Sequence, residues 1–191
     1  VSSKDDPPIV AFNQSSATPH YFVKKPRKLK QNTLILIDIW ARLKKKNSPF
    51  SDITWIAYYG KIPKQIQKTF NIILLSRDSC LNFIKKQLKK KQIPQGIEAD
   101  FVSKNIIMKA GFERNILHGT GHSIGFISPH GPPKHLNSKG DSKLKLNLGY
   151  TIEPGIYFKN KFGIRSEIDF YINKNYKLIV TTKMQKKIVN I

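Results

Sequence analysis

Four acidic residues, arranged as two pairs with one common spacing, constrain the fold more than any other feature of this chain. Asp38 and Asp52 are 14 positions apart, and so are Glu153 and Glu167. Each pair flanks a polar, turn-rich segment, which predicts a hairpin whose acidic residues face each other across two strands. Cross-strand neighbours have Cβ atoms about 5 Å apart, and like charges at that separation destabilise a sheet. Two such pairs in apolar strands therefore indicate a bound cation.

The segments around these carboxylates are typical of strands. Residues 34–41 (LILIDIWA) predict an interior strand with one buried carboxylate, and residues 52–60 (DITWIAYYG) predict its partner. Further strands are expected over residues 9–12, 150–158, 163–172 and the segment KLIVTT, residues 177–182.

The segment between the two predicted hairpins is helical in pattern. Pro63 suits a first helical turn, and apolar residues then recur at helical spacing as far as Leu88. A second helix is expected over residues 98–109, with Gly111 at its end. Residues 128–141 are rich in Pro, Gly, Asn and Ser and predict a loop. Strands and helices together indicate an α+β fold.

The segment HGTGHSIG, residues 118–125, is compatible with three kinds of site. A phosphate-binding loop is disfavoured, because the glycines do not follow G-x-G-x-x-G and no Lys-Ser/Thr pair follows them. A nucleophilic serine at Ser123 is also disfavoured, because a Pro-rich loop rather than a helix follows GHSIG. The remaining interpretation is that the segment supplies an imidazole ligand to a metal.

Four carboxylates and one imidazole suit two divalent ions bridged by carboxylate oxygens. The donors fit Mn²⁺, Fe²⁺, Co²⁺ or Zn²⁺ and lack the thiolates of a structural zinc site. Each residue alone has a structural alternative: Asp52 as a turn residue, Glu153 and Glu167 as strand charges, His122 as a hydrogen-bonded core histidine. Asp38 is hardest to explain otherwise, because an unpaired carboxylate after LILI would be costly.

Four segments, LILIDIWA…SDITW, HGTGHSIG, YTIEPGIYF and FGIRSEID, resemble in order the signature segments of the pita-bread metallopeptidases. That family includes methionine aminopeptidase, prolidase and Xaa-Pro aminopeptidase, and ATPHY, EPGIYF and GIRSEID resemble the Xaa-Pro aminopeptidase/prolidase branch. The resemblance implies the pita-bread fold, with helices on the outer face of a curved, mostly antiparallel sheet. The family's two helices before the first strand are absent, so residues 1–191 are expected to be an N-terminally truncated catalytic domain.

The resemblance also implies a role for each acidic residue and for one histidine. Asp38 would bind one ion, His122 with Glu153 would bind the other, and Asp52 with Glu167 would bridge them. Glu153 would in addition carry the proton that is transferred during hydrolysis.

Four further residues take substrate-related roles by the same resemblance. His118 and His130 would contact the substrate and stabilise the tetrahedral intermediate. His20 would line the substrate site, and Arg165 would orient a bridging carboxylate or close the site. His118, His130 and Glu153 are therefore the predicted catalytic residues.

The implied function is metal-dependent hydrolysis of peptide bonds at the N-terminus, of the Xaa-Pro aminopeptidase or prolidase type. Its cofactors would be two divalent ions, with Mn²⁺ favoured over Co²⁺, Fe²⁺ and Zn²⁺, and its substrate a peptide with proline second. The alternative is a catalytically inactive pita-bread fragment or a binding module for protein or nucleic acid. The presence of all five expected ligands favours the enzyme. A homodimer is a further possibility.

The net charge of +22 raises the question of a polyanionic partner. Only five of the 34 basic residues are arginine, and the lysines are scattered, with local runs at residues 44–46 and 89–91. We therefore expect nucleic acid to bind only nonspecifically. No apolar run approaches the roughly 20 residues of a membrane span, and Cys80 is the only cysteine, so a cytoplasmic protein is expected.

Overall fold

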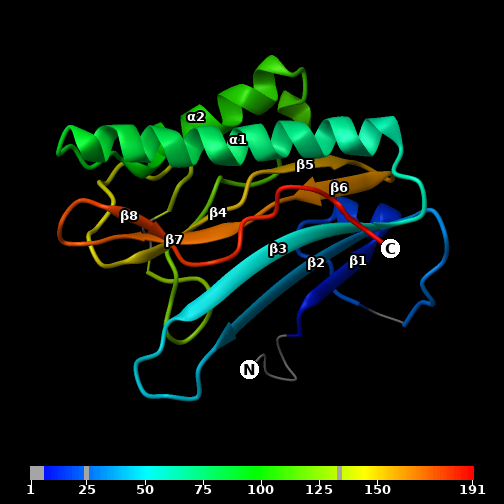
Figure 1. The fold of residues 1–191 in the computed structure, drawn as a ribbon, viewed down its shortest axis with the longest axis horizontal. Helices are drawn as coiled ribbons and strands as arrows, with labels where there is room; N and C mark the ends of the chain where they lie inside the picture. Colours follow the sequence, from blue (N-terminus) through cyan, green and yellow to red (C-terminus); the bar gives the residue numbers. More distant parts are fainter. Residues whose placement is uncertain (1–6, 24–25, 133–134) are drawn as a thin grey trace.

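The computed structural model describes residues 7–23, 26–132 and 135–191 (Figure 1). The strands are β1 (Ile9–Phe12), β2 (Thr33–Arg42), β3 (Phe50–Tyr59), β4 (Gly149–Ile152), β5 (Gly155–Phe158), β6 (Phe162–Arg165), β7 (Ile168–Ile172), β8 (Leu178–Val180) and β9 (Val189–Asn190). The helices are α1 (Lys64–Lys89) and α2 (Gly96–Lys109), with short 3₁₀ turns at Asn13–Ala17 and Glu113–Asn115.

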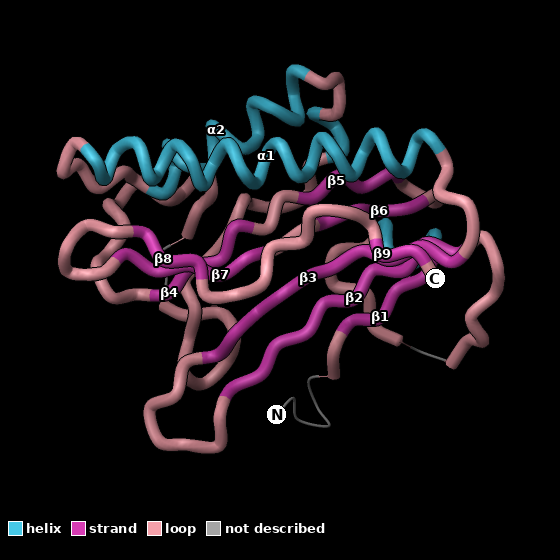
Figure 2. The backbone as a smooth tube through the Cα atoms, in the orientation of Figure 1, coloured by secondary structure: helices cyan, strands magenta, loops and turns pink. Residues whose placement is uncertain are grey.

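The strands form a four-stranded sheet in the order β1-β2-β3-β9, a three-stranded sheet β4-β7-β8 and the pair β5-β6. All pairings are antiparallel except that of β3 with β9. Figures 1 and 2 show α1 and α2 together along one side of the strands. This arrangement confirms the predicted α+β architecture with helices on the outside of mostly antiparallel strands.

The β2–β3 hairpin forms as predicted, but its register differs from the expected one. Asp38 lies opposite Thr54, and Asp52 lies opposite Trp40, so the two aspartates are diagonal neighbours rather than direct partners. The prediction of direct opposition is wrong for this pair, because the loop between Arg42 and Phe50 is centred one residue later than assumed. Since side chains alternate along a strand, a shift of two positions still leaves both carboxylates on one face.

The second acidic pair lies where two short ladders meet. Ile152 pairs with Ile168 in one ladder and Gly155 with Arg165 in the other, and a common register places Glu153 opposite Glu167 between them. The continuous strands expected over residues 150–158 and 163–172 are thus interrupted, since Pro154 after Glu153 has no N–H to donate.

The backbone groups at this interruption bond elsewhere. The N–H of Glu153 donates to the carbonyl oxygen of Thr120, at 2.7 Å, and the N–H of Glu167 donates to that of Thr54, at 3.2 Å. Each glutamate is therefore fixed to a different segment of the chain.

The helices match the predicted periodicity, with small shifts at their starts. Pro63 caps α1 instead of forming its first turn. The helix α2 starts two residues earlier than expected, because the carboxylate of Glu98 accepts a hydrogen bond from the N–H of Gln95. Gly111, with φ +84°, ends that helix as predicted. Among the described residues, no helix is both long and apolar enough to cross a membrane.

Candidate metal centre

A cavity of about 160 Å³ lies beside β2 and β3. The segment after α2 also lines it, as do the two interruptions, one between β4 and β5 and one between β6 and β7. Its wall includes eight of the nine predicted site residues: His20, Asp38, Asp52, His122, His130, Glu153, Arg165 and Glu167. Ile9, Trp40, Ser128 and Pro129 complete the lining. His118 is not part of the described wall.

Three of the predicted ligands form a compact donor cluster. Asp52, His122 and Glu167 each offer one ligand atom, and these atoms lie within 4.8 Å of one another. The Nε2 atom of His122 is also 3.3 Å from Oε1 of Glu153 and 3.8 Å from Oδ2 of Asp52. The cluster thus combines carboxylate oxygens with one imidazole nitrogen, as the sequence predicts.

The imidazole of His122 is oriented for a ligand role. Its Nδ1 lies 2.9 Å from the carbonyl oxygen of Ser123, which can only accept, so Nδ1 carries the proton. The lone pair on Nε2 then faces Asp52 and Glu153. Burial lowers the pKa of His122, which favours the neutral ring that binds metals.

The carboxylates repel one another in a buried environment. Burial first, and then the charges of Asp38, Glu153 and Asp169, raise the pKa of Asp52 to about 9. Burial and Asp52 likewise raise the pKa of Glu167 well above its ordinary value. The Oδ1 atom of Asp52 is buried and has no hydrogen-bond partner among the described residues. A cation would offset this repulsion and be coordinated by such an unpaired oxygen. The donor set therefore fits divalent metal ions.

Asp38 is held by two partners, of which the guanidinium of Arg165 offsets its charge. The guanidinium Nη2 of Arg165 forms an ion pair with Oδ2 of Asp38, and Thr54 donates to Oδ1 at 3.0 Å. The Nε atom of Arg165 also lies 3.9 Å from Oε2 of Glu153. Arg165 therefore contacts two of the predicted ligands, which is compatible with the orienting role that the sequence suggests.

Thr54 is a site residue that the sequence analysis missed. Its hydroxyl oxygen lies 2.7 Å from Oε2 of Glu167 and 3.0 Å from Oδ1 of Asp38, and it accepts a 2.9 Å hydrogen bond from Nε of Arg165. Thr54 follows Asp52 by two positions and so shares its face of β3, a spacing that could have identified it.

Asp169 was missed as well. Its Oδ2 atom accepts 2.9 Å hydrogen bonds from the N–H of Asp52 and from the hydroxyl of Ser51. Burial raises the pKa of Asp169 to about 7. An acidic residue two positions after Glu167 in an apolar strand was the available signal.

The predicted substrate histidines occupy different surroundings. The ring of His130 packs on that of His122, with centroids 4.3 Å apart, and both rings face the cavity. His118 instead lies 2.7 Å from the hydroxyl of Tyr157, whose oxygen accepts a 3.3 Å hydrogen bond from Arg165. The structure thus connects His118 to the cavity through Tyr157 and Arg165 rather than at its wall.

Known proteins with similar sequences are peptidases. The model of metallopeptidase family M24 matches residues 2–174. An uncharacterized peptidase of Staphylococcus epidermidis is 30% identical over 173 residues, which is 91% of this chain and 46% of that protein. The chain therefore spans about half the length of the curated relatives it matches.

Solved structures agree with the sequence relatives. A dipeptidase from Pyrococcus horikoshii OT3 superposes with a TM-score of 0.84 at 27% identity, covering 96% of this chain and 48% of that one. An X-Pro aminopeptidase from Thermotoga maritima MSB8 superposes with a TM-score of 0.81 at 28% identity, with the same two coverages. The predicted pita-bread fold is confirmed by these neighbours, and the chain belongs to metallopeptidase family M24.

Proposed function

We propose that this chain carries the catalytic centre of a binuclear-metal exopeptidase that hydrolyses Xaa-Pro bonds at the N-terminus of a peptide. The observation that carries the proposal is the convergence of five separate segments on one cavity, each with a ligand side chain: Asp38, Asp52, His122, Glu153 and Glu167. The buried Oδ1 atom of Asp52, which has no hydrogen-bond partner among the described residues, also supports the proposal. The Xaa-Pro preference is supported by the sequence branch and by the named activity of a similar solved structure.

The five ligands would hold two divalent ions, with Mn²⁺ the first candidate. When bound, such ions polarise the scissile carbonyl and lower the pKa of a water molecule between them. By the family resemblance Asp52 and Glu167 would bridge the ions, and the mutual repulsion of these two buried carboxylates supports a cation shared between them.

Other residues of the cavity position the substrate and move its proton. Glu153 is the proposed proton carrier, since its side chain is 14% exposed and its two oxygens lie near His122 and Arg165. His130 and His20 are on the cavity wall, where they would contact the peptide backbone. His118 would act on the substrate only indirectly, through the hydroxyl of Tyr157. Replacing His118 should therefore reduce turnover less than replacing His130.

The decisive experiment combines metal analysis with turnover. The purified protein is loaded with Mn²⁺, its bound metal is counted, and hydrolysis of Ala-Pro and of Ala-Pro-Gly-Gly is followed. We expect about two ions per chain and cleavage of one or both substrates. Two bound ions without turnover would favour the inactive-fragment alternative, and no bound metal would remove the basis of the proposal.

Single substitutions test the ligand assignment. Asp52→Ala and Glu167→Ala should abolish both metal binding and turnover, because each removes a bridging carboxylate. Asp141→Ala is the matched control, since this aspartate is exposed and lies outside the cavity. Full activity in Asp52→Ala or Glu167→Ala would refute the bridging roles.

A further inference from the structure

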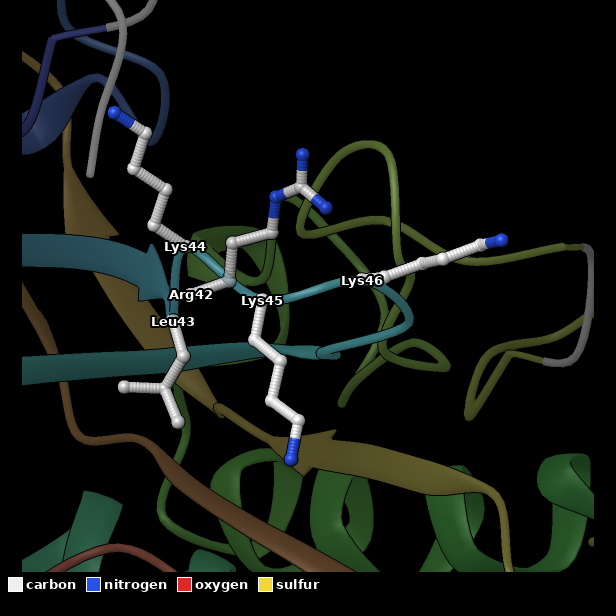
Figure 3. Close-up of a pocket in the computed structure, with 5 residues that line it drawn as sticks. All are labelled: Arg42, Leu43, Lys44, Lys45 and Lys46. Carbon is white, nitrogen blue, oxygen red and sulfur yellow. The ribbon is translucent and has the colours of Figure 1, made fainter.

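The loop that joins β2 to β3 carries a dense positive charge. Arg42, Leu43 and Lys44–Lys46 line a surface hollow of about 440 Å³, and Figure 3 shows the three lysine side chains pointing away from one another. All three lysines are exposed. Within the described part of the chain, no ion pair involves any of them. Residues 44–46 are called the basic loop below.

The basic loop follows the strand that leads out of the candidate metal centre. Trp40 lines the metal cavity and pairs with Asp52. Arg42 follows on the same face of β2, two residues or roughly 7 Å further out. The basic loop begins just beyond it.

A second contact ties the end of the hairpin loop to the cavity wall. The N–H of Phe50, at the return of the hairpin, donates to the carbonyl oxygen of Gly125 at 3.0 Å. The N–H of Gly125 in turn donates to the carbonyl oxygen of Pro129, which lines the cavity. A single short loop therefore separates the hairpin from the cavity.

Distance and charge together define what the basic loop can recognise. A peptide whose first bond lies at the metal centre extends by about 3.4 Å per residue. A peptide that follows β2 outward from the cavity would bring its third to fifth residues within reach of the flexible lysine side chains. At physiological ionic strength, exposed charges interact over about 8 Å, so acidic side chains at those positions would be attracted while those of a dipeptide would not.

We propose that the basic loop is a specificity site that favours peptide substrates with acidic residues just beyond the cleaved bond. This inference rests on the proposed peptidase function and adds a substrate class to it. Each exposed lysine–carboxylate pair is a weak interaction, so the preference is the sum of several.

The test compares two peptides of equal length, Ala-Pro-Glu-Glu-Ala and Ala-Pro-Gln-Gln-Ala. We expect kcat/KM to be about 5–10-fold higher for the glutamate peptide at low salt, and the ratio to fall toward one at high salt. The combined change Lys44→Gln, Lys45→Gln and Lys46→Gln should reduce the ratio to below about twofold. Turnover of Ala-Pro or Ala-Pro-Gly-Gly, neither of which carries an acidic side chain, reports whether the metal centre is intact in each protein.

The chain offers a matched control. Lys89→Gln, Lys90→Gln and Lys91→Gln remove the same charge from an exposed run at the C-terminal end of α1, and the glutamate preference should survive. If both triple variants lose the glutamate preference to the same extent, net charge alone steers the peptide and the proposal fails. It would also fail if the original protein cleaves both pentapeptides equally.

A final arm separates peptide recognition from nucleic-acid binding. Binding of a ten-nucleotide oligothymidylate is measured for both triple variants by fluorescence anisotropy. We expect the two variants to lose affinity equally, as nonspecific attraction requires. If only the basic-loop variant loses affinity, while its peptide preference is unchanged, the loop is a nucleic-acid surface and the proposal is overturned. Absence of turnover of both Ala-Pro and Ala-Pro-Gly-Gly in all proteins would instead count against the proposed function.

Discussion

The hydroxyl of Thr54 occupies the centre of the polar network that orders the carboxylates. It contacts Asp38 in β2 and Glu167 between β6 and β7, and it receives a hydrogen bond from Arg165. Since a hydroxyl has a single proton, it donates to one carboxylate at a time. Thr54 thus links the two ends of the donor set without being a ligand itself.

Replacing Thr54 with valine tests this positioning role. Thr54→Val keeps the shape but leaves Asp38 and Glu167 without their shared donor, and we expect Mn²⁺ affinity to fall about 10–100-fold. Isothermal titration calorimetry measures the change. The control is Thr69→Val, a buried threonine that donates only to the carbonyl oxygen of Gln65 in its own helix. Comparable metal affinity in the two variants would show that Thr54 is only structural.

At the scale of elements, one buried arginine joins α1 to the segments that carry Asp52 and Glu167. The Nη1 atom of Arg77 donates to the hydroxyl of Ser166, next to Glu167, at 2.7 Å and to the carbonyl oxygen of Gln185 at 2.9 Å. The side chain of Gln185 then bonds both the N–H and the carbonyl oxygen of Ile56, two residues after Thr54. Arg77 therefore ties α1 to the residue before Glu167 and, through Gln185, to β3, the strand that carries Asp52.

Substituting Arg77 should destabilise the protein more than substituting an exposed arginine. Arg77 is 1% exposed, and its removal leaves buried acceptors without donors. Arg77→Leu is therefore expected to lower the free energy of unfolding by about 3 kcal/mol. Urea denaturation measures this, with Arg114→Leu as the control at an exposed site, where the loss should stay within about 0.5 kcal/mol. Equal losses would mean that the Ser166–Gln185 contacts contribute nothing.

At the scale of the whole molecule, we expect the acidic cluster to couple metal binding to stability. In the metal-free protein, the folded state keeps protons on Asp52, with its pKa raised from 3.8 to about 9, at pH values where the unfolded chain has released them. The stabilisation is present at low pH and is lost as pH rises through the folded pKa, so the free energy of unfolding falls between about pH 4 and pH 9. Metal ions replace the protons and should reverse this trend.

The pH dependence is measured by thermal unfolding with EDTA and with Mn²⁺. In EDTA, Tm should be at least about 3 °C lower at pH 8.5 than at pH 5.5. A Mn²⁺ concentration 100 times the Kd measured at pH 8.5 should raise Tm at that pH by about 5–10 °C. The same concentration should raise Tm by less at pH 5.5. Glu98→Gln at the start of α2 serves as a carboxylate control that lies outside the cavity and should keep the metal response. A metal response that does not grow with pH would contradict the proton–metal exchange.

Local patterns in the sequence were sufficient to predict both hairpins, the two helices and the acidic residues that meet in the cavity. The reason is that strand alternation and helical periodicity are properties of neighbouring residues, and a carboxylate in an apolar strand is costly wherever the strand packs. The two-residue register difference of Asp38 and Asp52 did not harm the prediction, because a shift by two keeps the face.

Only the tertiary structure decided how those carboxylates are held and what surrounds them. Asp169 bonds to Asp52 across 117 positions, Thr54 bonds to Glu167 across 113, and Gln185 bonds to Ile56 across 129. Contacts between residues so distant in sequence depend on how the sheets and α1 pack together, and no local pattern encodes them. For the same reason, only the fold shows that the lysine run at residues 44–46 follows the strand leading out of the candidate metal cavity, while the similar run at residues 89–91 lies at the end of a helix.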